Sequence, residues 1–91
     1  MNLDIPFLQD GQFAVGKAQL ATGIVLNNKG AFYISGNDLN TMYEIFDNYA
    51  NAEKFALDKI ISNPDNECWI VNSKGTHIIT YDKYGERKNS L

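Results

Sequence analysis

The stretch NYANAEKFALDKIISNPDNECWIVNSKGTHIIT, residues 48–80, contains a helix signal followed directly by a hairpin signal. Asn48 is a good helix cap, since its side-chain carbonyl can accept from a first-turn N–H group. Pro64 ends the helix at about residue 63, because proline has no N–H to donate. Between these limits the apolar side chains recur at helical spacing, which predicts an amphipathic helix over about 48–63. Its apolar face carries Tyr49, Ala52, Ala56 and Ile60.

Two segments that flank the helix share one pattern. GIVLNNKGAFYIS (23–35) and CWIVNSKGTHIIT (68–80) each contain an apolar triplet, an Asn, a Lys-Gly pair and a second apolar run. Glycine can adopt the positive φ that a tight turn needs, and asparagine can close the turn with a side-chain hydrogen bond. Both segments are therefore predicted to form hairpins.

Alternating apolar residues indicate further strands. TMYEIFDN (41–48) is consistent with one strand, and GQFAVGK (11–17) with another, which we interpret as an edge strand punctuated by glycine. The order of strands, helix and hairpin predicts an α+β fold, with an antiparallel sheet of about five or six strands and the helix packed on one face. We expect residues 1–91 to form a single domain in which residues 83–91 are a frayed tail.

Composition narrows the functional classes. A single cysteine excludes an internal disulfide and suits a reducing cytoplasm. The first ten residues lack the features of a secretory signal, and no stretch approaches the ~20 apolar residues of a membrane span, so we expect a soluble cytoplasmic protein. A formal net charge of −3 argues against direct binding to nucleic acid, which requires clustered Lys and Arg.

The negative charge is concentrated in the middle of the chain. Residues 38–67 carry seven acidic and two basic residues, for a formal charge of −5. Such a segment can offer an electronegative surface to a basic protein, and aromatic side chains close to it are the type that anchors interfaces. The alternative is a solvated acidic face beside aromatics that pack in the core. The candidate partner-binding residues are Tyr43, Asp47, Tyr49, Glu53, Asp65, Glu67 and Trp69.

Sites for chemistry are weakly indicated. GQFAVGKA (11–18) is close to the phosphate-loop signature, but Ala18 replaces the Ser or Thr that binds Mg²⁺, and no apolar strand precedes it. His77 is the only histidine and has no evident proton-transfer partner, so we expect a half-exposed strand residue. Cys68 adjoins an apolar run and is expected to pack as a small hydrophobe. We therefore expect no catalytic residues, no cofactor and no metal.

The run MYEIFDNYANAEKFALDKIISNPDNECWIVNSKGTHI (42–78) resembles small bacterial immunity proteins encoded beside polymorphic or contact-dependent growth inhibition toxins. The shared features are a strand, a short helix with an alanine-centred face, an Asn-Pro stop, and an acidic-aromatic strand leading to a hairpin. The resemblance implies an antitoxin that binds its cognate toxin domain, often a nuclease, in a stoichiometric complex in the cytoplasm. It transfers no specific functional residues to this chain.

Two other classes remain open. A self-associating module could add strands from a second copy at an exposed sheet edge, for which the glycine-rich first strand is a candidate. A small enzyme could use His77 with Tyr81 and nearby carboxylates.

Overall fold

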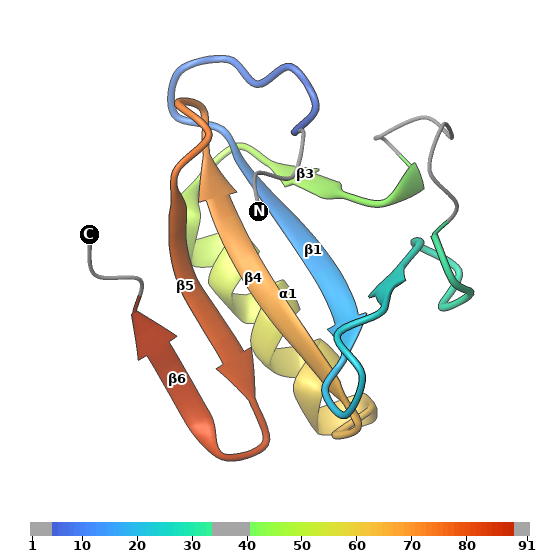
Figure 1. Cartoon of the computed structure of the whole chain (residues 1–91). Helices are drawn as coiled ribbons and strands as arrows, with labels where there is room; N and C mark the ends of the chain where they lie inside the picture. The colour runs from blue at the N-terminus through green and yellow to red at the C-terminus, as the bar shows by residue number, and fades with distance from the viewer. Residues whose placement is uncertain (1–4, 34–40, 89–91) are drawn as a thin grey trace.

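The computed structural model of the protein describes residues 5–33 and 41–88. It shows a six-stranded antiparallel sheet in the order β2-β1-β4-β5-β6, with β3 paired to β1, and one helix behind it (Figure 1). The predicted α+β architecture is confirmed. The elements are β1 (Phe13–Gln19), β2 (Val25–Leu26), β3 (Glu44–Phe46), α1 (Tyr49–Ser62), β4 (Asn66–Asn72), β5 (His77–Asp82) and β6 (Gly85–Lys88).

Helix α1 begins and ends where its sequence signals lie. The Asn48 side chain accepts from the Asn51 N–H at 2.9 Å, and the Asn63 N–H donates to the Lys59 carbonyl at 2.9 Å, directly before Pro64. These bonds satisfy backbone groups that a helix end otherwise leaves open. The predicted range of about 48–63 is therefore confirmed.

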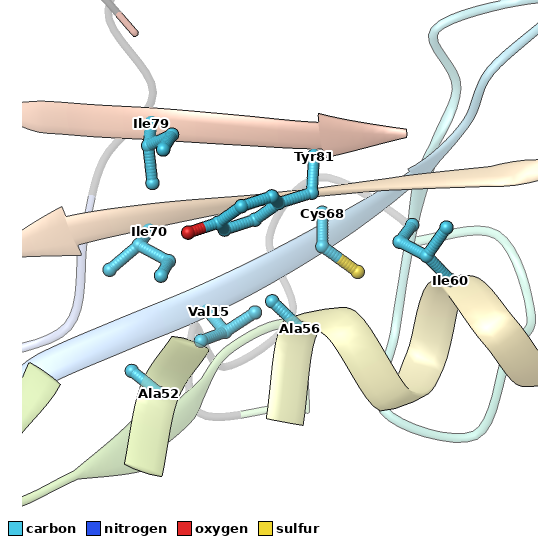
Figure 2. Packing of buried hydrophobic residues seen from close by; sticks show 8 residues of the cluster. All are labelled: Val15, Ala52, Ala56, Ile60, Cys68, Ile70, Ile79 and Tyr81. Carbon is cyan, nitrogen blue, oxygen red and sulfur yellow. The ribbon is translucent and has the colours of Figure 1, made fainter. Parts of the chain in front are cut away.

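One hydrophobic core lies between α1 and the sheet. Ala52 and Ala56 of the helix are fully buried, and their small side chains let the helix backbone approach the strands closely. Figure 2 shows these alanines and Ile60 facing side chains from three neighbouring strands. The strand residues of this helix-side core are Val15, Cys68, Ile70, Ile79 and Tyr81.

A second core lies on the opposite face of the sheet, beneath the segment before β1 and the segment before β3. Its centre is Trp69, whose indole covers Gly16 so closely that a Cβ added there would stand 2.5 Å from Trp69 Cε2. The glycine is therefore required by the approach of the ring. The buried members are Leu8, Ala14, Ala18, Met42, Tyr43, Trp69 and Val71.

The two Asn-x-Lys-Gly turns have the same hydrogen bonds. Asn27 Oδ1 accepts from the N–H groups of residues 29 and 31 at 2.9 and 3.0 Å, and Asn72 Oδ1 accepts from those of residues 74 and 76 at 2.9 and 3.0 Å. Gly30 and Gly75 follow with φ of 84° and 81°. The turn chemistry is thus as predicted, although the first hairpin is shorter, since β2 has two residues and a single bridge joins Leu26 to Phe32. Residues 34 and 35 of the predicted hairpin lie outside the described residues.

Two expectations are wrong. The glycine-rich first strand is not an edge, because β1 pairs with β4 along one side and with β2 and β3 along the other. Residues 85–88 of the predicted tail form β6 against β5 after a two-residue turn, whereas residues 89–91 lie outside the described residues. A local hydrogen bond closes the turn that leads into β6, since the Asp82 carboxylate accepts from the Tyr84 N–H at 2.7 Å.

Candidate protein-interaction surface

The structure does not bring the seven predicted partner-binding residues together. Three of them lie at the N-terminal half of α1, three lie along β4 and the turn that precedes it, and one is buried in the core opposite the helix. The first group is Asp47, Tyr49 and Glu53, the second is Asp65, Glu67 and Trp69, and the buried residue is Tyr43. Asp38, which contributes to the acidic segment, lies outside the described residues.

Tyr43 and Trp69 are not exposed anchors, because only 2% and 5% of their surfaces are accessible. The Trp69 indole N–H donates to Tyr43 Oη at 3.3 Å, and the rings meet edge to face with centroids 6.3 Å apart. Aromatic rings with satisfied polar groups are stable inside a core. The sequence signal for this burial is Gly16, a glycine inside a strand that marks close approach of another group.

The group on α1 fixes the helix to the sheet. The Tyr81 hydroxyl donates to Glu53 Oε2 at 2.7 Å and lies 3.4 Å from the Tyr49 hydroxyl. Burial raises the pKa of Tyr81, and the hydrogen bonds to Tyr49 and Glu53 raise it further, so the phenol keeps its proton. Tyr49 also packs edge to face on Phe13, with ring centroids 5.5 Å apart. Two of the three predicted residues here are thus engaged in holding the fold.

Asp47 is the exposed member of this group. Its carboxylate accepts from Gln12 Nε2 at 3.1 Å, which links the segment before α1 to the segment before β1. Of the group at α1, this residue retains the most surface for contact with another molecule.

The face of the sheet opposite α1 is open over β5 and β6, since no described element lies in front of these strands in Figure 1. Between β1, β4 and β5 this face contains a hollow of about 190 Å³, which we call the open-face hollow. It brings Glu67 and Trp69 of the predicted set together with two residues that sequence reasoning did not place there, His77 and Thr80. The lining residues are Ala18, Gly23, Val25, Glu67, Trp69, His77 and Thr80.

The open-face hollow is part aromatic and part acidic. The rings of Trp69 and His77 are stacked, with centroids 6.0 Å apart and planes 23° apart. Burial lowers the pKa of His77 below its usual 6.5, so the imidazole is neutral at pH 7 and adds no positive charge. Glu67 is half-buried at the edge of the hollow and supplies its carboxylate. Thr80, which also lines the hollow, is paired with Trp69 across β4 and β5.

The residues that could perform chemistry are engaged in packing. Cys68 is fully buried, and this burial raises the pKa of its thiol to about 11, although Lys17 and Lys59 oppose the change. Lys17 is 4% exposed; its ammonium donates to Asn28 Oδ1 at 3.3 Å and lies 5.8 Å from the Phe55 ring centroid. Burial lowers the pKa of this lysine. Within residues 5–33 and 41–88, no three His, Cys, Asp or Glu side chains converge as a metal site.

The phosphate-loop resemblance of residues 11–18 has no structural counterpart. Gly16 and Lys17 lie inside β1, in the middle of the sheet, and no helix follows them. A phosphate loop needs a turn at a helix N-terminus, whose N–H groups point at the phosphates. A continuous strand that pairs on both sides does not present its N–H groups in this way.

The two residues on which an enzyme hypothesis rested lie on opposite faces of the sheet. His77 stacks on Trp69 at the open face, whereas Tyr81 lies in the helix-side core and bonds to Glu53. The irregularity between Ile70 and Val71 shifts the register of β4 against β5 and allows this arrangement.

The described part of the chain has no helix long and apolar enough to cross a membrane. Comparison with protein-family models, with curated proteins and with solved structures finds no match. The chain is therefore classified by its architecture, which is a single helix on an antiparallel sheet whose other face is partly open.

Proposed function

We propose that this chain is an immunity protein, which neutralises a cognate bacterial toxin domain by forming a stoichiometric complex with it in the cytoplasm. The observation that carries the proposal is the open-face hollow, where Glu67 lies near the half-buried His77 ring, which stacks on the buried Trp69. The resemblance of residues 42–78 to immunity proteins supports the same function. No catalytic step, cofactor or metal enters this proposal.

The chemistry of the open-face hollow favours a basic partner. A guanidinium or ammonium group entering the hollow would meet the Glu67 carboxylate, which attracts cations, and the neutral His77 ring, which stacks on the buried Trp69. The formal net charge of −3 of the chain would attract such a partner at long range and raise the rate of association. A toxin domain that attacks nucleic acid has a positively charged surface for its substrate. We propose that this surface binds at the open-face hollow.

The experiment is co-expression with the toxin domain encoded by the neighbouring gene. We expect the two chains to co-purify in a fixed ratio and the wild-type protein to restore growth of cells that express the toxin domain. Glu67→Lys should reduce protection, because it reverses the charge at the hollow. Asp58→Lys is the matched control, since Asp58 lies on α1, behind the sheet, and has a 60% exposed side chain.

The proposal fails if the toxin domain neither co-purifies with the wild-type protein nor loses its toxicity in its presence. Equal loss of protection in Glu67→Lys and Asp58→Lys would retain binding but remove the open-face hollow as its site.

A further inference from the structure

A second concave surface lies at one end of the sheet. Figure 1 shows the β1–β2 turn, the C-terminal end of α1 and the β5–β6 turn at the same end of the sheet. They enclose a cleft of about 590 Å³, which we call the end cleft. It shares no lining residue with the open-face hollow. The residues that matter for its chemistry are Leu20, Leu26, Asn63, Asp65, Lys83 and Tyr84.

One wall of the end cleft is a projecting hairpin tip, formed by Lys83 and Tyr84. Tyr84 is 82% exposed, so most of its ring is accessible to another molecule. The Lys83 ammonium lies 5.3 Å from the Tyr84 ring centroid, so the tip presents an aromatic surface with a positive charge against it. The bond from the Tyr84 N–H to the Asp82 carboxylate holds the turn in shape.

The rest of the end cleft is complementary to this tip in charge and polarity. The half-buried Leu20 gives it an apolar surface above the buried Leu26, and Asp65 supplies an exposed carboxylate. Asn63 caps the C-terminus of α1, where the helix dipole places partial negative charge. The Asp65 carbonyl accepts from the Leu20 N–H at 2.8 Å, which fixes the carboxylate-bearing turn against the end of β1. An apolar cleft with a fixed negative group suits an aromatic ring that carries a cation.

We propose that the end cleft is the site of a two-fold homodimer, in which the Lys83–Tyr84 tip of each copy enters the end cleft of the other. The tip and the cleft lie side by side on one molecule, and a two-fold axis between them satisfies both contacts at once, as an isologous interface requires. Tyr84 then packs on Leu20 of the second copy. Lys83 pairs with Asp65 of the second copy, and the reciprocal pair forms symmetrically.

The exposed surface next to the end cleft fits this arrangement. Ile61, in the last turn of α1, is 79% exposed and lies two residues before Asn63 of the cleft. Together with Tyr84 it gives the end of the molecule two large apolar side chains in water, which an interface would cover. The contact involves one end of a 91-residue chain, so we expect a dissociation constant between about 1 µM and about 1 mM.

Analytical ultracentrifugation over a concentration series tests the proposal. The wild-type protein should pass from monomer to dimer. Tyr84→Ala, Asp65→Lys and Lys83→Asp should each raise the dissociation constant tenfold or more, since each removes a reciprocal contact twice per dimer. The double variant Asp65→Lys with Lys83→Asp should restore the dimer, because the charge pair is then re-formed in the opposite sense.

Lys74→Asp serves as the control, since Lys74 is an exposed lysine in the β4–β5 turn and makes the same change of charge. Circular dichroism shows whether each variant is folded, and all the substituted side chains are on the surface. A wild-type protein that stays monomeric at about 1 mM overturns the proposal. So does a dimer that Tyr84→Ala leaves intact, or a double variant no better than the single charge reversals. None of these three results bears on toxin binding, because toxin binding is measured with a different partner.

Discussion

Replacing Gly16 by alanine is a direct test of how the two faces of the sheet are built. In a strand, alanine is intrinsically favoured over glycine by roughly 0.5–1 kcal/mol, so an unobstructed site would gain stability. At Gly16 the added Cβ would stand 2.5 Å from Trp69 Cε2 and 2.9 Å from Trp69 Nε1. Both distances are shorter than non-bonded heavy atoms tolerate, so the indole must shift.

The cost follows from what the indole loses. Overpacking a core by one methyl group costs about 1–3 kcal/mol. Displacing Trp69 also weakens the hydrogen bond from its N–H to Tyr43 Oη, worth about 1 kcal/mol. After subtraction of the intrinsic gain, we expect Gly16→Ala to lower the free energy of unfolding by about 1–3 kcal/mol. The intrinsic preference for alanine raises the free energy of unfolding, whereas the contact with Trp69 lowers it. The sign of the measured change therefore shows whether the indole obstructs a side chain at residue 16.

Urea unfolding followed by circular dichroism measures this change, and the emission of Trp69, the only tryptophan, reports whether the ring moves. The matched control is Gly16→Ala in a Trp69→Phe background, where the smaller ring should relieve the contact and reduce the cost. If Gly16→Ala is as stable as the parent protein and the emission of Trp69 is unchanged, the indole does not restrict residue 16 to glycine.

Three further outcomes are expected. Tyr81→Phe should lower the free energy of unfolding by about 1–2 kcal/mol, because Glu53 loses its donor, whereas Tyr84→Phe should change it by less than about 0.5 kcal/mol; urea unfolding compares the two. Since burial lowers the pKa of His77, the unfolded chain binds its proton more readily. Urea midpoints should therefore fall as pH drops from 7 through 6.5 toward the folded-state pKa, and less so in His77→Gln. Since burial raises the pKa of Cys68 to about 11, an aromatic disulfide reagent at pH 8 should modify the thiol far more slowly in the native protein than in urea; equal rates would show an accessible thiol.

The elements that sequence reasoning predicts well are those with local causes. The ends of α1 follow from Asn48 and Pro64, and the β4–β5 turn follows from Asn72 and Gly75, because each of these residues acts on the backbone within a few positions. The alternation of apolar residues also identifies β1 and the short β3, whereas β6 was not predicted.

Strand order and burial depend on contacts distant in sequence. The glycines of the first strand suggested an edge, but Gly16 is required by Trp69, which is 53 positions away in the chain. An alternating strand assigns Trp69 to one face of the sheet without showing that the segment carrying Leu8 covers that face. For the same reason the acidic and aromatic residues of 42–69, which are neighbours in sequence, lie on opposite faces of the sheet.

Isothermal titration calorimetry at low salt can measure the affinity of the proposed toxin domain for three forms of this protein. The claim under test is that the protein acts by binding a basic partner at the open-face hollow. Wild type and Asp58→Lys should bind with one-to-one stoichiometry and similar affinity, and Glu67→Lys should bind at least tenfold more weakly. Undiminished binding by Glu67→Lys, or no heat of binding with the wild-type protein, would contradict it.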